Sequence, residues 1–381
     1  MPDQDKKFGL YIHIPFCKAK CNYCDFNSYP GLESLAAPYF KALEQEISCW
    51  APLMKNNQIA SIFIGGGTPS LVEPQLITRL MASCKNNFNI ISGAETTIES
   101  NPGTLTLEKL YAYRNSGINR LSMGVQACQD SLLKLMGRIH SVNEFDENFR
   151  HAREAGFDNI NLDLIFGLPG QSPEEWKETL EYAVRPGVTH LSCYSLKIEE
   201  GTVFARKVDN GELLPLEEEL DRQMYADARK ILVQKGFRQY EISNFARPGF
   251  ECSHNLIYWR AEEYLGIGAG AHSYVDGSRF NNLYGVKEYI DKSASLEKLQ
   301  ENLQVIDRQE SMSEYMMLGF RLLDGVNSKA FQARYGENPE EVFGEKLKRL
   351  LKMELIEQNT DNFRLTEYGL DIANRVFAEF V

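Results

Sequence analysis

The chain has 381 residues, of which 43% are hydrophobic and 25% charged, so it resembles ordinary globular proteins and is long enough for two or three domains. Its formal net charge of −12 argues against a protein whose main task is to bind nucleic acid. The N-terminus has no apolar signal segment and no later run is long enough to cross a bilayer, so we expect a cytoplasmic protein.

The first predicted element is a strand over residues 8–14, where apolar side chains occupy every second position. Pro15 ends this strand because proline cannot donate to a sheet ladder. Cys17, Cys21 and Cys24 follow directly, with the spacing C-x3-C-x2-C. These three cysteines stand at the carboxyl end of the strand, in one short loop.

Three neighbouring cysteines have few uses. A disulfide framework needs pairs and belongs to small secreted chains, and structural zinc needs a fourth ligand close by. An iron–sulfur cube normally takes four thiolates, so three would leave one iron open for chemistry. We therefore favour a cluster with an open iron over zinc or buried thiols.

The cysteine spacing, with Tyr23 just before the last cysteine, resembles the signature of the radical S-adenosylmethionine (SAM) superfamily. The resemblance implies a [4Fe–4S] cluster held by Cys17, Cys21 and Cys24, whose open iron chelates the amino and carboxylate groups of SAM. In that superfamily an electron from the reduced cluster splits the sulfonium and gives a 5′-deoxyadenosyl radical.

Further strands are predicted in alternation with helices. The strands cover residues 59–64, 95–100, 118–126, 159–166 and 188–196. Helices are predicted over residues 32–50, 74–88, 107–115, 131–136 and 216–235, and capping boxes at Ser141/Glu144 and Ser172/Glu175 start two more. Six strands alternating with helices predict parallel βαβ units, whose sites lie at the carboxyl ends of the strands. The fold class is therefore α/β, an open six-stranded barrel of the kind the resemblance also implies.

Glycine and polar residues fall at those carboxyl ends. Gly65–Gly67 would let the backbone approach a small charged ligand, although a tight turn or a phosphate loop would also explain it. Glu99 and Asp163 need partners if they are buried. The hydroxyls and sulfonium of SAM would serve, and so would a structural ion pair with Arg120 or Arg138.

The remainder of the chain lacks this regular alternation of strands and helices. Residues 236–306 hold aromatic and glycine clusters, and helices are predicted from about residue 307. A hairpin over residues 355–366 precedes a last helix that reaches residue 380. We predict a barrel over residues 1–235, a mixed α+β segment over 236–306 and a winged-helix-like domain over 307–381. We interpret this last domain as a packing or partner module, not as a DNA reader.

Several motifs resemble the oxygen-independent coproporphyrinogen III oxidase group: His13–Cys17, Gly65–Pro69, Gly124–Gln126 and Asp163–Pro169. The resemblance implies that Tyr11, Gly66 and Glu99 contact the cluster-bound SAM. Around a second SAM it places Tyr23, Gly67, Thr68, Gln126, Arg138 and Asp163.

Two departures point to the sister branch of that group, the HemW haem chaperones. The decarboxylating oxidases carry a fourth cysteine where Phe26 stands here, and a longer N-terminal segment. The motif from His254 to Trp259 also resembles the chaperone branch. His254 and Tyr258 would share one helix face, and either could bind haem iron. The alternative is a histidine with satisfied hydrogen bonds, packed under Trp259, and His13 and His272 are weaker haem candidates.

The resemblance therefore implies a chaperone that binds haem and hands it to acceptor haemoproteins, such as respiratory enzymes at a membrane surface. It also implies an electron donor for the cluster and dimerisation. Radical oxidative decarboxylation of coproporphyrinogen III is the first alternative, and a non-catalytic zinc or scaffold protein is the second. No catalytic residue is assigned.

Overall fold

A computed structural model describes residues 7–381, and residues 1–6, part of the N-terminus without an apolar signal segment, lie outside the described part. Six neighbouring strands form the centre of one sheet, and each pair of neighbours runs parallel. They are β1 (Lys7–Ile14), β4 (Gln58–Gly66), β5 (Asn89–Ser100), β6 (Arg120–Gln126), β7 (Asn159–Phe166) and β8 (His190–Ser195). The predicted parallel six-stranded core is confirmed.

The predicted helices between and directly after these strands are also present. They are α1 (Ala36–Trp50), α2 (Pro74–Asn87), α3 (Leu107–Asn115), α4 (Asp130–Leu135), α5 (Val142–Glu154), α6 (Pro173–Ala183) and α8 (Glu218–Gln234). Both predicted capping boxes form, at the first residues of α5 and α6. The first helix begins later than residue 32 because a 3-10 turn, Glu33–Leu35, precedes it.

The sheet continues through residues 236–306, which the sequence pattern did not predict. Beyond β8 lie the antiparallel strands β10 (Asn244–Ala246) and β9 (Arg238–Glu241). Beside β1 lies the parallel strand β11 (Tyr264–Ile267), followed by the antiparallel strands β12 (His272–Val275), β13 (Ser278–Asn282) and β14 (Gln300–Val305). The short helix α9 (Ser253–Trp259) connects the two ends of the sheet.

The C-terminal residues form the predicted helices and hairpin. The helices are α12 (Arg308–Gly319), α13 (Ser328–Tyr335), α14 (Pro339–Lys352), α15 (Glu367–Asp371) and α16 (Ala373–Phe377). The hairpin of β16 (Ile356–Gln358) and β17 (Asn362–Leu365) is joined by β15 (Val326–Asn327) into a three-stranded sheet. The last predicted helix is divided at Ile372, where φ is −124° and ψ is 37°.

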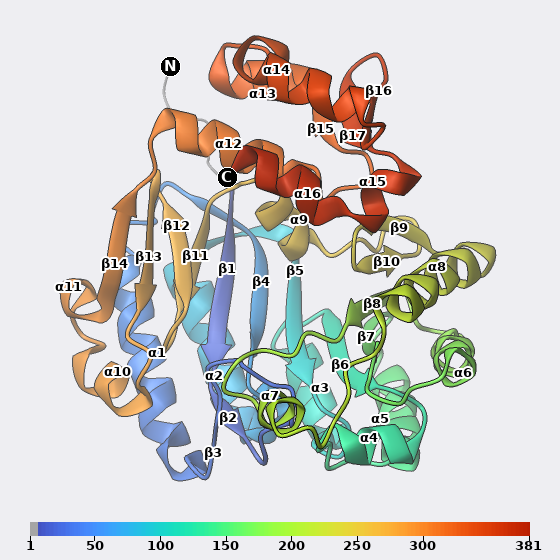
Figure 1. The fold of residues 1–381 in the computed structure, drawn as a ribbon. Coiled ribbons are helices and arrows are strands. Elements are labelled where there is room, and N and C mark those ends of the chain that lie inside the picture. Colours follow the sequence, from blue (N-terminus) through green and yellow to red (C-terminus); the bar gives the residue numbers. More distant parts are fainter. Residues whose placement is uncertain (1–6) are drawn as a thin grey trace.

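The cysteine loop and the C-terminal module, which runs from α12 to the C-terminus, lie at opposite ends of the parallel strands (Figure 1). The module lies across the end where β1 begins, whereas β2 (Phe16–Cys17) and β3 (Tyr29–Pro30) lie where β1 ends. The candidate site is therefore built at the carboxyl ends of the parallel strands. No helix within residues 7–381 combines the length and the apolar character needed to cross a membrane.

Candidate functional site

The three cysteines line one cavity of about 430 Å³ at the carboxyl ends of the strands. We call it the cysteine cavity, and its walls include Cys17, Cys21, Cys24, Gly66, Gly67, Thr68, Glu99, Gln126, Arg138 and Asp163. The cysteine loop is anchored to the turn after α4, because the backbone N–H of Asn22 donates to the carbonyl of Met136 at 2.9 Å. The fold thus brings together all the residues predicted around the cluster and SAM except Tyr11, and Tyr23 lines the same cavity.

Each cysteine sulfur has a polar neighbour. The Sγ atom of Cys17 lies 3.6 Å from the Thr68 hydroxyl, and Arg138 Nη1 donates to Cys21 Sγ at 3.5 Å. Burial raises the pKa of the Cys17 and Cys24 thiols, while hydrogen bonds from neighbouring groups oppose that rise. A bound metal would therefore have to deprotonate these thiols, which is the usual course of metal binding.

The cysteine cavity offers a cluster both thiolates and a charged neighbour. The three sulfurs lie around its walls, and the guanidinium of Arg138 faces the thiolate that an iron would create. These residues therefore fit the cluster that the sequence predicts.

The glycine loop after β4 leaves space that any other residue would fill. Gly66 has φ of +117°, and a Cβ there would lie 2.5 Å from the imidazole of His13. A Cβ on Gly67 would lie 2.7 Å from the carbonyl oxygen of Phe16 and 3.0 Å from Cys17 Sγ. The backbone of this loop can therefore approach a ligand beside the cysteines.

Glu99 projects from β5 beside the glycine loop, and its Oε2 accepts a hydrogen bond from the backbone N–H of Gly66 at 2.9 Å. Burial, followed by the nearby charge of Asp163, raises its pKa from 4.5 to about 7. No arginine within the described part of the chain lies within ion-pair distance of Glu99 or Asp163, although the positive charge of Arg120 partly opposes the rise in the pKa of Glu99. Arg120 instead pairs with Glu95 at 3.9 Å.

Around Asp163, the wall of the cysteine cavity carries polar side chains that hydrogen-bond to one another. Asp163 accepts hydrogen bonds from Ser122 Oγ at 2.8 Å and from Asn161 Nδ2 at 2.9 Å. Gln126 ends β6 with φ of +70°, and its buried side-chain oxygen has no hydrogen-bond partner. A strained residue with an unsatisfied oxygen in a cavity wall is suited to accept a hydrogen bond from a ligand.

The sequence analysis missed Asn101, which connects the two sides of this cavity. Its Nδ2 donates to Thr68 Oγ1 at 2.9 Å, and its Oδ1 accepts from Arg138 Nη2 at 2.6 Å. Tyr194 and Lys197, at the end of β8, also line the cavity and were not predicted. In the sequence, only their position at or just after the end of a predicted parallel strand could have identified them as site residues.

A second cavity of about 410 Å³ adjoins the first and shares Phe26, Gly66 and Glu99 with it. We call it the aromatic cavity, and its walls include Tyr11, Phe26, Tyr258, Tyr264, His272 and Tyr284. Tyr11 points from β1 into this cavity, and its hydroxyl lies 2.9 Å from Nδ1 of His13. Its neighbours Leu10 and Ile12 are buried in the main core.

The structure places His254 and Tyr258 on one face of α9. The Tyr258 hydroxyl lies 2.9 Å from Nε2 of His254, and the Ser61 hydroxyl lies 2.9 Å from Nδ1. The His254 ring is buried and stacks on Phe63, whereas Trp259 stacks on Arg321 and does not cover it. Burial lowers the pKa of His254 to about 3, so its imidazole is neutral.

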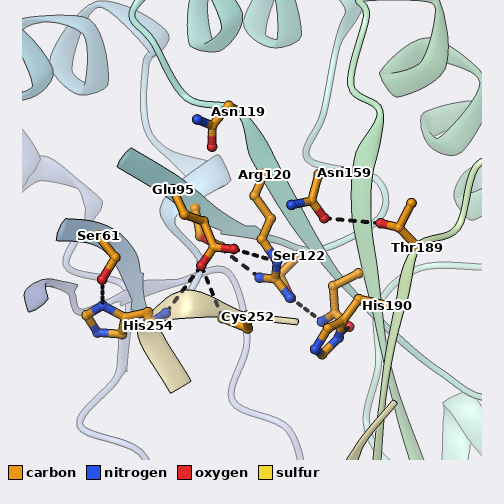
Figure 2. A network of polar contacts seen from close by, with 12 residues as sticks. Ser61, Glu95, Asn119, Arg120, Ser122, Asn159, Thr189, His190, Cys252 and His254 are labelled. Carbon is orange, nitrogen blue, oxygen red and sulfur yellow. Dashed lines mark hydrogen bonds and ion pairs between the residues drawn. The ribbon is translucent and has the colours of Figure 1, made fainter. Parts of the chain in front are cut away.

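A polar network supports this region from within the sheet (Figure 2). Glu95 accepts hydrogen bonds from the backbone N–H of His254 at 3.3 Å and from Cys252 Sγ at 3.4 Å. The same carboxylate faces Arg120, which is 2% exposed. The network fixes α9 against β5 and β6, and so sets where Tyr258 enters the aromatic cavity.

The chain is similar to known proteins over its whole length. Residues 11–183 match the Radical SAM superfamily, and residues 306–372 match the HemN C-terminal domain. Haem chaperone HemW of Bacillus subtilis is 39% identical over 98% of this chain and 99% of its own, and haem chaperone HemW of Escherichia coli is 33% identical over 98% of each. The solved structure of coproporphyrinogen III oxidase (HemN) from Escherichia coli superimposes with a TM-score of 0.86 at 26% identity, over 99% of this chain and 90% of that one.

Proposed function

Because the chain belongs to the HemW family of radical SAM proteins, we propose that it binds haem and transfers it to acceptor haemoproteins. The observation that supports this most is the aromatic cavity beside the cysteine cavity. Its walls are largely aromatic, which suits a flat apolar macrocycle, and its volume of about 410 Å³ is in the range of small-molecule sites. We propose that Tyr258 is one of the residues in contact with haem.

The cysteine cavity would hold the two cofactors of the superfamily. Cys17, Cys21 and Cys24 would bind the [4Fe–4S] cluster, and Gly66 and Glu99 would contact SAM at its open iron. Tyr11, which lines the adjoining aromatic cavity beside Gly66 and Glu99, would contact SAM from that side. When bound, these groups supply electron transfer and, in the superfamily, a 5′-deoxyadenosyl radical. The backbone of the glycine loop and the Glu99 carboxylate would orient SAM beside the cysteines.

Residues around Gln126 would contact a second SAM if one binds. The free side-chain oxygen of Gln126 and the carboxylate of Asp163 could accept hydrogen bonds from hydroxyl groups. Arg138, Gly67, Thr68 and Tyr23 would complete this site. Burial raises the pKa of Tyr23, so its hydroxyl stays protonated and can donate.

The proposed function implies several partners. Haem and a haemoprotein acceptor follow from the proposed function, and respiratory enzymes at a membrane surface are one class of acceptor. An electron donor would reduce the cluster, and two copies of the chain would form a homodimer. The C-terminal module, which lies at the ends of the strands opposite the cysteine loop, would be a surface for such protein contacts (Figure 1).

Oxidative decarboxylation of coproporphyrinogen III is the function against which this proposal is tested. Phe26 stands where the oxidases carry their fourth cysteine, and its side chain is 64% exposed at the boundary of the two cavities. The test is an anaerobic haem titration of the cluster-loaded chain, with coproporphyrinogen turnover assayed on the same sample. Stoichiometric haem binding without turnover supports the chaperone function, whereas turnover without stable haem binding contradicts it.

A further inference from the structure

The open rim of the aromatic cavity carries a histidine that the polar network does not use. His272 begins β12, directly after the tight turn that follows β11, and it is exposed to solvent. Tyr284, which is 45% exposed, follows β13, and its hydroxyl lies 3.2 Å from Nε2 of His272. Both side chains line the aromatic cavity with Phe26, so three exposed rings surround its rim.

The turn before His272 is shaped to bring this rim close to the cysteine loop. A Cβ on Gly270 would lie 2.6 Å from Nδ2 of Asn27 and 2.9 Å from the ring of Tyr284. Asn27 Nδ2 donates to the carbonyls of Ala269 at 3.0 Å and Tyr284 at 3.2 Å. A ligand at His272 would therefore lie next to the segment that carries Cys17, Cys21 and Cys24.

The other histidines of the chain are less suited to bind iron in this cavity. The chain has six, and His13, His190 and His254 are buried with both ring nitrogens engaged. His140 is buried beside Arg138, outside the aromatic cavity, and His151 lies on α5. His272 combines an open position with a place in the cavity wall.

We propose that His272 is the axial ligand of haem iron in the aromatic cavity, with Phe26 and Tyr284 packed against the porphyrin ring. This inference rests on the proposed haem-binding function and assigns its ligand to His272 in place of the buried His254. The bond forms when a lone pair of the neutral imidazole enters an open axial position of the iron, and the contact with the Tyr284 hydroxyl is replaced. No electron or proton has to leave the site.

The electrostatic environment supports a neutral ligand. Partial burial, followed by the positive charge of Arg279, lowers the pKa of His272 below its usual value. A neutral imidazole has a lone pair at neutral pH, which a protonated ring lacks. His254 has a neutral ring too, but to bind iron it would have to give up a hydrogen bond to Ser61 or Tyr258 inside the core.

The test is a haem titration of the full chain with three single variants, His272→Ala, His254→Ala and His151→Ala, followed by absorption and electron paramagnetic resonance. We expect His272→Ala to weaken haem binding by at least roughly tenfold and to change the spin state of the iron. Added imidazole should restore the wild-type spectrum, and His151→Ala should bind as wild type does. Because His272 is exposed, His272→Ala should retain the wild-type melting temperature.

Three outcomes would overturn the inference. Unchanged haem affinity and spectrum in His272→Ala would show that His272 is not the ligand, and loss of the spectrum only in His254→Ala would assign the bond to His254. Metal-free protoporphyrin that binds as tightly as haem would show that ring packing alone holds the ligand. If the wild-type chain with a normal cluster binds no haem at all, the proposed function itself fails, which separates the two failures.

Discussion

The Glu99→Gln substitution tests the electrostatics of the cysteine cavity quantitatively. Burial raises the pKa of Glu99 from 4.5 to about 7, so between these values the carboxyl is protonated in the folded chain and ionised in the unfolded chain. The folded state is favoured by this proton uptake at low pH, and the advantage is lost as the pH rises through 7. With about 1.36 kcal/mol per pKa unit, Glu99 should lower the free energy of unfolding by roughly 2–3 kcal/mol between pH 5 and pH 8.

Glutamine keeps an oxygen that can accept the hydrogen bond from Gly66 but does not ionise. Urea unfolding of the cluster-free chain at pH 5 and pH 8 should therefore show a fall in wild-type stability that is smaller by roughly 2–3 kcal/mol in Glu99→Gln. Glu46 is the matched control, since its pKa is also raised to about 7 by burial but it contacts Tyr289 and Asn282, away from both cavities. Glu46→Gln should reduce the pH dependence similarly, while only Glu99→Gln should weaken SAM binding to the cluster-loaded chain. Equal pH dependence in wild type and Glu99→Gln would refute the reasoning.

Further substitutions test the loop, the network and the caps. Gly66→Ala should cost about 2 kcal/mol in urea unfolding and weaken SAM binding, because the methyl group meets His13 and the φ of +117° suits glycine; wild-type SAM affinity would contradict this. Arg120→Met should cost about 3 kcal/mol by leaving the largely enclosed Glu95 carboxylate without its cation, and adding Glu95→Gln should recover part of the loss. Ser172→Ala removes the cap of α6, and a loss of about 1 kcal/mol with unchanged haem binding is expected; altered haem binding would show that the cap reaches the site.

The parallel core could be predicted because its signals are local. Each central strand is a short apolar run that a glycine, proline or polar cluster ends, and the capping boxes at Ser141 and Ser172 mark two helix starts. The strands of residues 236–306 gave no such signal, because β9–β12 have only three or four residues each, and β10 and β11 join the sheet by pairing with β8 and β1, which lie far away in the sequence. Pairing of that kind depends on tertiary context, which no window of the sequence contains.

Some residues of the candidate site could likewise be predicted from the sequence, and others could not. The cysteines, Gly66, Glu99, Gln126 and Asp163 could be placed together because parallel strands end at one edge of a sheet. The contact that Glu99 makes within the chain could not be predicted: the sequence suggested SAM or an arginine as its partner, whereas the structure shows the backbone N–H of Gly66 donating to it. His272 received little weight from the sequence, because only the fold shows that it lies in the wall of the cavity that Tyr258 enters.

The most direct test of the central claim is haem transfer under anaerobic conditions. The cluster-loaded chain carrying one equivalent of haem would be mixed with an apo-haemoprotein, and the rate compared with spontaneous release to a haem scavenger. The account predicts transfer faster than release, with coproporphyrinogen left unconverted by the same sample. Transfer no faster than release, or steady turnover of coproporphyrinogen, would contradict it.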